Sequence, residues 1–225
     1  EAAIGLVRTR EAGAPEPEAG IRGDARDILE EIGNAIPDST DPPAEIASDD
    51  LPTRRRGAFG LLRLEPAAAK EILPAALKSG DPIVRACACF VAGRIGADPA
   101  DVRPVLRDSH WLARAEAAGA LGRLEDPEAV SPLLEALGDK DAYVRRRVAA
   151  ALAQFHPDRV VSVLAAELRT GEPARREWAH RALESVLRRD FPFDPAKPES
   201  HREVWAKDIE DWYAKERARF EEPAP

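Results

Sequence analysis

The sequence has no methionine, only two cysteines and 5% aromatic residues in 225 positions. Cys87 and Cys89 are two positions apart in a predicted helix, where their side chains point in different directions. We therefore expect two buried thiols rather than a disulfide, with a redox or metal pair as the less favoured interpretation. Because the chain begins at Glu1 without methionine, we expect a trimmed or processed form, for which a missing signal peptide indicates no compartment.

The sequence also lacks the common signatures of catalysis and of membrane insertion. It contains no nucleotide-binding loop, no HExxH, no G-x-S-x-G and no paired cysteine clusters. No apolar run approaches the ~18 residues that a membrane-spanning helix needs. Four histidines lie in different parts of the chain without a second ligand at metal-binding spacing, and we interpret each as structural or surface-exposed: His110, His156, His180 and His201. We expect no catalytic residue, no cofactor and no metal.

What the sequence does contain is a helical pattern that recurs every 29 to 31 residues. Arginines hold the same place in successive units, at Arg54, Arg85, Arg114, Arg145 and Arg176. Two further marks agree with this register, namely arginines nine residues later and prolines early in the second helix of a unit: Arg63, Arg94, Arg123, Pro74, Pro104 and Pro132. These marks define five units, at about 51–80, 81–108, 109–139, 140–170 and 171–190, the last a single helix.

Acidic residues followed by proline mark the predicted helix starts in this pattern. Asp is a good N-cap, and proline suits the first helical position because its missing N–H would have no partner there. Five such pairs lie where helices are predicted to begin: Glu65-Pro66, Asp81-Pro82, Asp98-Pro99, Asp126-Pro127 and Glu172-Pro173. Four glycines lie where helices are predicted to end: Gly80, Gly96, Gly138 and Gly171. The 20 prolines therefore indicate helix boundaries more than disorder.

The segments DPIVRACACFVAGRIG, WLARAEAAGALGRLEDPEAVSPLLEAL and AYVRRRVAAALAQF resemble HEAT-like repeats of the short kind often called phycobilisome-lyase-type HEAT repeats. The resemblance covers about 51–190. It implies an all-α fold, a right-handed α-solenoid of helical hairpins, and it implies little about function because such repeats serve unrelated partners. Such repeats often pair an Asp at the end of one unit with the Arg six residues later. Asp108/Arg114 and Asp139/Arg145 match that spacing, so the resemblance implies an Asp–Arg ladder in the middle of the stack.

Charge divides the chain into three predicted parts. Residues 1–50 carry 13 acidic and 4 basic side chains and read as an acidic N-terminal extension, with one short helix over 24–36 and a turn-rich connector over 37–50. Residues 51–190 carry 19 acidic and 23 basic side chains and form the predicted solenoid. Residues 191–225 comprise a Pro/Phe connector and a capping helix, predicted over 200–220.

The capping helix is predicted from an aromatic and apolar stripe, which consists of Val204, Trp205, Ile209, Trp212, Tyr213 and Phe220. We expect it to cover the last repeat, although a partner-binding helix is the alternative. Phe191 and Phe193 are expected to pack onto the last repeat as well.

The binding surface is predicted from the second helices of the units. Their apolar stripes should face the core, and residues off those stripes should face outward, on the inner curve of the solenoid. This reasoning gives nine candidate partner-binding residues, of both charge signs: Lys70, Arg103, Arg107, Glu128, Ser131, Glu135, Arg159, Ser162 and Arg169. A merely solvated face is the alternative interpretation.

Three hypotheses of function follow. The first is a non-enzymatic scaffold or assembly subunit that binds a protein partner through the solenoid surface. The second, allowed by the resemblance, is a lyase-type or chromophore-handling accessory protein. The third, disfavoured by the net charge of −8, is a HEAT-like nucleic-acid binder resembling the alkylpurine DNA glycosylases. Neither the partner, the compartment nor the oligomeric state follows from the sequence.

Overall fold

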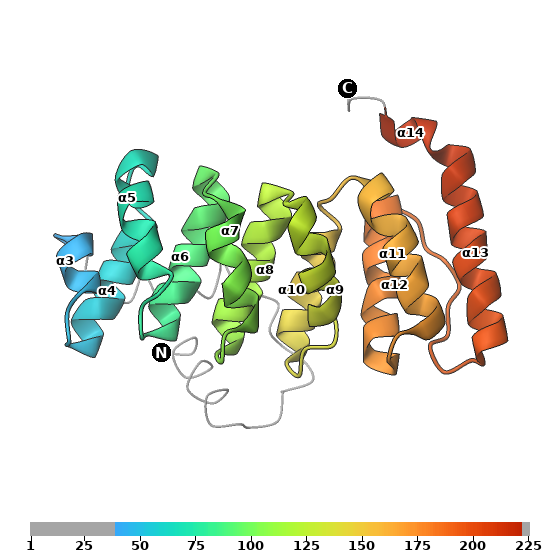
Figure 1. The fold of residues 1–225 in the computed structure, drawn as a ribbon, viewed down its shortest axis with the longest axis horizontal. Coiled ribbons are helices and arrows are strands. Elements are labelled where there is room, and N and C mark those ends of the chain that lie inside the picture. Colours follow the sequence, from blue (N-terminus) through green and yellow to red (C-terminus); the bar gives the residue numbers. More distant parts are fainter. Residues whose placement is uncertain (1–38, 222–225) are drawn as a thin grey trace.

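The computed structural model describes residues 39–221, and this part of the chain is a row of helical hairpins with no strand (Figure 1). The first helices of the units are α4 (Leu51–Leu61), α6 (Pro82–Ile95), α8 (Trp111–Leu124), α10 (Ala142–Leu152) and α12 (Pro173–Leu187). The second helices are α5 (Pro66–Ala76), α7 (Pro99–Val102) with the 3₁₀ turn η1 (Arg103–Arg107), the 3₁₀ turn η2 (Pro127–Ala129) with α9 (Val130–Ala136), and α11 (Pro157–Thr170). The prediction of an all-α solenoid is confirmed.

Three more helices flank the repeats: α3 (Pro42–Ile46), α13 (Glu199–Glu216) and α14 (Ala218–Glu221). The helix predicted over 24–36 lies outside the described residues. The connector predicted over 37–50 contains α3, so that prediction was wrong for its middle part. Asp41 accepts a hydrogen bond from the Ala44 N–H and Pro42 occupies the first turn, which is the same Asp-Pro signal that marks the other helices.

Acidic N-caps start the repeat helices as expected. Asp81, Asp98 and Asp126 each accept a hydrogen bond from the backbone N–H two residues later. Glu65 and Glu172 stand at N-cap positions without a side-chain cap bond, consistent with the weaker capping of glutamate. Histidine serves the same purpose twice, because the Nδ1 atoms of His110 and His156 accept from the N–H groups of Leu112 and Asp158.

The first helices form a densely packed layer. In α8 every residue from Trp111 to Gly122 is buried, and α8 contacts both α6 and α10 along its length. Small residues permit this close approach. A Cβ atom on Gly93 would lie 2.8 Å from the Ala120 Cα, and one on Gly122 would lie 2.8 Å from the Ala151 Cα. The alanine-rich composition of these helices therefore sets the distance between units.

Substituting Gly122 with alanine tests this close packing. Gly→Ala normally favours a helix by up to about 1 kcal/mol, but here the new methyl group has no room. We expect a net loss of stability on the order of 1–3 kcal/mol, because the helix backbones must separate. Gly80→Ala is the control, since a Cβ there meets nothing within 4 Å. Chemical denaturation of both variants measures the effect, and equal stability of the two would contradict the packing argument.

The boundaries between units use one recurring arrangement of arginine. The guanidinium groups of Arg85, Arg114 and Arg145 each donate to the backbone carbonyl six residues earlier, at 2.7, 2.9 and 2.7 Å. Arg54 does the same to Ser48 at 2.9 Å through its Nε. The residue at this earlier position also accepts from the N–H two residues after it, through a hydroxyl at Ser48 and Ser79 and through a carboxylate at Asp108 and Asp139.

The carboxylates extend this arrangement within the unit that each aspartate ends. Asp108 accepts two hydrogen bonds from Arg85 near the start of the same unit, and Asp139 accepts two from Arg114 at 2.7 and 2.8 Å. The expected Asp–Arg ladder is therefore present, with one correction. The arginine six residues after each aspartate, in the next unit, binds its carbonyl, and the arginine of the aspartate's own unit binds its carboxylate. Buried bidentate pairs of this kind fix the register of neighbouring units.

Asp108 is expected to make the fold sensitive to acid. Burial raises the pKa of its carboxyl group, but the hydrogen bonds from Arg85 and the His110 N–H outweigh burial and hold the pKa below its usual value of 3.8. A lowered folded-state pKa contributes stability above the unfolded pKa, and this contribution disappears as the pH falls through the folded pKa. Asp108→Asn should cost on the order of 2 kcal/mol at pH 7, and progressively less as the pH falls below about 4.

The measurement is urea denaturation of the native chain and of Asp108→Asn between pH 3 and pH 7. The control is Asp101→Asn, because Asp101 is exposed on α7. A stability difference that stays constant over the whole pH range would contradict the assignment.

The C-terminal helix α13 packs against α11 and closes the stack. Ile209 and Tyr213 are buried, Trp205, Trp212 and Phe220 are half-buried, and Val204 is 57% exposed. Val204 was therefore wrongly placed in the predicted stripe, because it lies on the opposite side of the helix from the core. The predicted helix over 200–220 is interrupted at Arg217, where α13 ends and α14 follows.

The Pro/Phe connector lies between α12 and α13, as expected for Phe191 and Phe193. The Phe193 ring stacks on His180 of α12 at 4.9 Å between centroids and meets Trp205 of α13 edge-on at 5.6 Å. Phe191 meets Trp212 edge-on at 5.5 Å. The connector therefore contributes aromatic contacts to both neighbouring helices.

Candidate functional site

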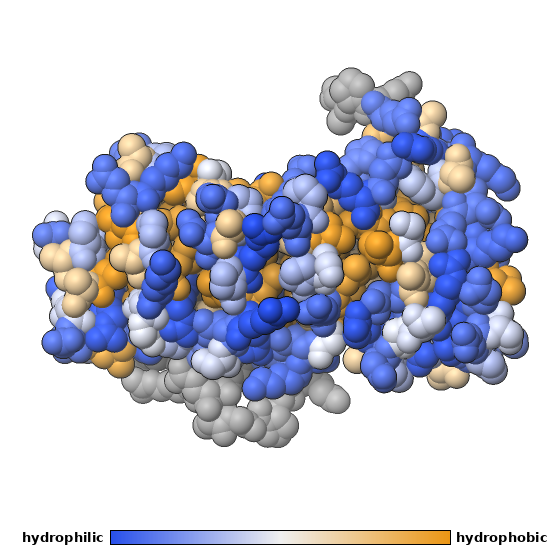
Figure 2. Space-filling model, in the orientation of Figure 1, coloured by the Kyte–Doolittle hydropathy of each residue, from blue (hydrophilic) through white to orange (hydrophobic). Residues whose placement is uncertain are grey.

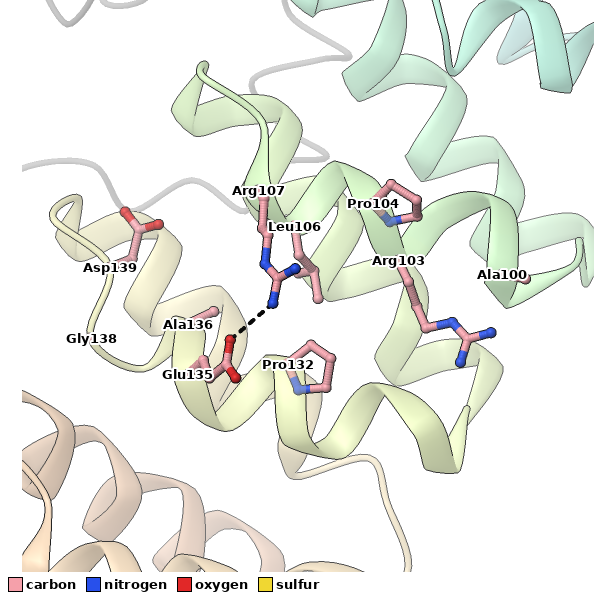
Figure 3. Close-up of a pocket in the computed structure, with 10 residues that line it drawn as sticks. All are labelled: Ala100, Arg103, Pro104, Leu106, Arg107, Pro132, Glu135, Ala136, Gly138 and Asp139. Atoms are coloured by element: carbon pink, nitrogen blue, oxygen red, sulfur yellow. Dashed lines mark hydrogen bonds and ion pairs between the residues drawn. The ribbon is translucent and has the colours of Figure 1, made fainter.

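A groove opens between the second helices of the second and third units (Figure 3). Its volume is about 540 Å³, and it lies on the face of the solenoid formed by the second helices. It is lined by small and apolar side chains, by charged side chains, and by the loop that follows α9: Ala100, Arg103, Pro104, Leu106, Arg107, Pro132, Glu135, Ala136, Gly138 and Asp139.

The local sequence explains why the second helices leave this groove. Proline has no N–H to donate within a helix, and the α7 segment continues into a 3₁₀ turn that contains Pro104. The third unit also begins its second helix with a 3₁₀ turn, and Pro132 follows in the first turn of α9. These short, irregular helices contact one another much less than the first helices do. Apolar surface consequently remains visible between the charged side chains over this layer (Figure 2).

Charged side chains join the two walls of the groove. Arg107 from η1 donates a hydrogen bond to Glu135 of α9 at 3.3 Å, with 80% of the arginine side chain and 62% of the glutamate side chain exposed. Arg103 donates to Glu128 and lies 3.5 Å from the buried carboxylate of Asp126. The bond to Glu128 and the nearby Asp126 raise the pKa of Arg103 above its ordinary value. The basic wall thus belongs to the second unit and the acidic wall to the third.

The structure brings together four of the nine predicted binding residues and spreads the other five. Arg103, Arg107 and Glu135 line the one groove, and Glu128 accepts a hydrogen bond from Arg103. Ser131 is exposed at the start of α9. Lys70 is exposed on α5, and Arg159 and Ser162 are exposed on α11, outside the groove lining.

Arg169 does not belong to this open surface. Its side chain is only 20% exposed and donates to Glu203 at 3.0 Å and to Glu210 at 3.2 Å, both on α13. The bonds to Glu210 raise the pKa of Arg169. The prediction placed Arg169 on a solvent-facing stripe because it expected α13 to cover only the apolar surface of the last repeat. The charged side of α11 is covered as well, so Arg169 holds the cap in place.

The prolines and small residues of the groove were missed as functional candidates. Pro104 and Pro132 were used only as marks of the repeat register, and Leu106 only as part of the core-facing stripe. The repeat register itself could have identified Pro104 and Pro132 as groove residues. Prolines at the same place in neighbouring second helices predict two adjacent helices that cannot pack as regular α-helices.

The groups expected to be structural have structural contacts. Cys87 and Cys89 are free, fully buried thiols, and burial raises the pKa of both. His180 lies 2.9 Å from the carbonyl oxygen of Phe191, and His156 lies 3.3 Å from that of Phe220. Over residues 39–221, no group of three or more His, Cys, Asp or Glu side chains is arranged to hold a metal ion. No helix in that range is both long and apolar enough to cross a membrane.

Comparison with known proteins agrees with this architecture. Residues 99–184, which run from the start of α7 into α12, match a family model described as HEAT repeats. No curated protein matches the chain. One solved structure, the crystal structure of an engineered protein from the Northeast Structural Genomics Consortium, is similar with a TM-score of 0.47 and 18% identity, over 76% of this chain and 87% of that chain. Residues 99–184 therefore match HEAT repeats, and the same register of helical hairpins continues on both sides of them.

Proposed function

We propose that the chain is a non-enzymatic scaffold that binds a protein partner on the surface of its second helices, centred on the groove between η1 and α9. The observation that carries the proposal is the composition of this groove. It combines an apolar lining of Leu106, Ala136 and prolines with an exposed basic side chain on one wall and an exposed acidic side chain on the other. Protein interfaces combine an apolar centre with a polar rim in this way.

The sign of the charges favours a protein over a nucleic acid as the partner. A nucleic-acid surface needs a continuous basic stripe, because phosphates supply most of the affinity. Here both arginines of the groove, Arg103 and Arg107, lie beside a glutamate, so the electrostatic potential changes sign across its width. A partner segment with an apolar side chain between an acidic and a basic residue complements such a groove.

The scaffold proposal also accounts for the use of the ionisable groups. Four aspartates with little exposed side chain serve the fold. Asp108 and Asp139 bind arginines at the boundaries between units, and Asp81 and Asp126 cap helices. HEAT repeats commonly act as interaction surfaces, and the second-helix layer of this chain exposes charge and apolar surface together (Figure 2).

Charge reversal in the groove tests the proposal. The partner is first captured from cells that naturally produce the protein, with and without residues 1–50. Arg107→Glu and Glu135→Arg should each weaken capture about tenfold or more, because each puts like charges together across an interface. The unfolding free energy should change by less than about 1 kcal/mol, because exposed ion pairs contribute little to stability.

The control is Gln154→Glu, which adds a charge at an exposed position just after the C-cap of α10. Capture should be unchanged by this substitution. Equal capture by the native chain and by both groove variants would contradict the proposal.

A further inference from the structure

The arginine ladder has a hydroxyl in place of the carboxylate at its first and last boundaries, at Ser79 and Thr170. At the two boundaries between them, an aspartate carboxylate is bound by the arginine of its own unit and its carbonyl by the arginine of the next unit. Arg114, Asp139 and Arg145 form such a set between the third and fourth units. Between the fourth and fifth units, the register places Arg145 and Arg176 on either side of Thr170. Threonine supplies no carboxylate, and its hydroxyl donates to the Ala166 carbonyl at 3.3 Å.

The two arginines at this boundary have unused donors. Arg145 is half-buried and bonds the Asp139 carbonyl through Nη1, while its Nε is buried and has no acceptor. Arg176 is also half-buried with a buried Nε lacking an acceptor, and no side-chain hydrogen bond or ion pair is found for it within residues 39–221. A guanidinium group carries five N–H donors in a planar fork, and leaving such donors unpaired inside a protein is costly.

Nearby acidic side chains are already engaged. Asp139 is bound by both donors of Arg114 at 2.7 and 2.8 Å. Glu167 on α11 accepts from Arg175, whose side-chain stem also lies 3.3 Å from the Cβ position of Gly138. The start of α12 thus lies beside the same loop that holds Arg145, with no described carboxylate bonded to Arg145 or Arg176.

We propose that Arg145 and Arg176 form a binding site for a carboxylate group, which takes the place that Asp108 and Asp139 fill at the preceding boundaries. The geometry favours a carboxylate over a phosphate, because this register position holds an aspartate carboxylate bidentately on arginine one unit earlier. The proposal is independent of the groove between η1 and α9. The carboxylate comes either from a free small anion or from an acidic side chain of another protein.

Acetate is the first probe. The melting temperature of the full chain is measured at pH 7 in sodium acetate and in sodium chloride of equal ionic strength. The native chain should melt at a higher temperature in acetate, because a ligand that binds only the folded state stabilises it. Thr170→Asp should raise the melting temperature in chloride and remove the acetate-specific rise, because the new carboxylate occupies the site.

Three further variants separate binding from general effects of salt. Thr170→Ser keeps the site and should keep the acetate-specific rise, and Arg159→Gln, an exposed position on α11, should keep it too. Arg145→Gln should lose it. An acetate-specific rise that persists in Thr170→Asp or in Arg145→Gln would overturn the proposal. So would a rise produced by sodium phosphate and not by acetate.

A peptide arm identifies the source of the carboxylate. Chemical-shift changes are followed while N-acetyl-Gly-Asp-Gly-amide, its Asn counterpart or acetate is added to the labelled full chain. Tighter binding of the Asp peptide than of acetate supports an acidic side chain of another protein as the occupant, and equal binding supports a free anion. Equal binding of the Asp and Asn peptides would overturn the proposal, and Thr170→Asp should abolish the shifts for each carboxylate probe.

Discussion

Removing residues 200–225 is expected to destabilise the protein severely, or to make it aggregate, even though every arginine-marked unit is intact. The truncation exposes the apolar surface of the last units, where Ile209 and Tyr213 are buried and three aromatic rings are half-buried. Fully burying one large apolar side chain stabilises a fold by roughly 1.5–3 kcal/mol, so together these residues rival the whole stability of a domain, which is about 5–15 kcal/mol.

Polar contacts add to this expected loss. Truncation removes the partners of Arg169 on α13, and it removes Tyr213 and Arg217, which donate to Asp158 at 2.6 and 2.7 Å. Both hydrogen bonds help to hold the pKa of Asp158 below its ordinary value, with Tyr213 as the larger cause. Two charged side chains of α11, Arg169 and Asp158, would therefore lose these partners at once.

Thermal unfolding of the truncated chain measures this result, and two point substitutions serve as a matched pair. Ile209→Asp buries a charge at a position that is 1% exposed and should reproduce most of the loss. Val204→Asp places the same charge at a position that is 57% exposed and should leave the melting temperature nearly unchanged. A soluble truncated chain of native stability would instead identify α13 as a detachable partner-binding arm.

Leu133→Asp and Leu164→Asp are each expected to unfold the chain. Both leucines are completely buried, on α9 and α11, and face the layer of first helices. An aspartate there must either bury an unpaired charge or become protonated, and it also leaves a cavity. These costs together amount to several kcal/mol, on the order of total domain stability.

Each leucine has an internal control two residues earlier in the same helix. Ser131 and Ser162 are exposed, so Ser131→Asp and Ser162→Asp add the same charge without burying it. Circular dichroism at increasing temperature should show native melting for the serine variants and little folded protein for the leucine variants. An unchanged melting temperature for both leucine variants would contradict the assignment of the core-facing stripe.

The fold was accessible from the sequence because its signals are local and repeat. An Asp-Pro pair followed by an apolar stripe specifies a helix start in the same way at every unit, so helices such as α6 and α7 begin at the predicted residues. The helix α3 was missed although Asp41-Pro42 carries the same signal, because the segment is too short to show apolar periodicity.

The site was only partly accessible because it depends on contacts between units. The apolar pattern of the sequence distinguishes the solvent-facing residues of η1 and α9 from their core-facing residues. It does not show that Arg107 and Glu135 form a hydrogen bond across a groove. Nor does it show that α13 lies along α11 and binds Arg169, since nothing local in α11 records a helix that follows more than thirty residues later. The direction of the aspartate–arginine bonds was also missed, because spacing along the chain does not reveal which unit donates to a carboxylate.

The central claim, that a protein partner docks in the groove between η1 and α9, is tested most directly by site-specific photocrosslinking in cells that naturally produce the protein. The crosslinker benzoylphenylalanine is placed at Arg107 or Glu135 on the groove walls, and at Gln154 outside the groove as the reference position. The account predicts one discrete protein adduct from the groove positions, which is absent from the reference position and is lost when the opposite wall of the groove is charge-reversed. An adduct of equal yield at all three positions, or one formed only from Gln154, would contradict it.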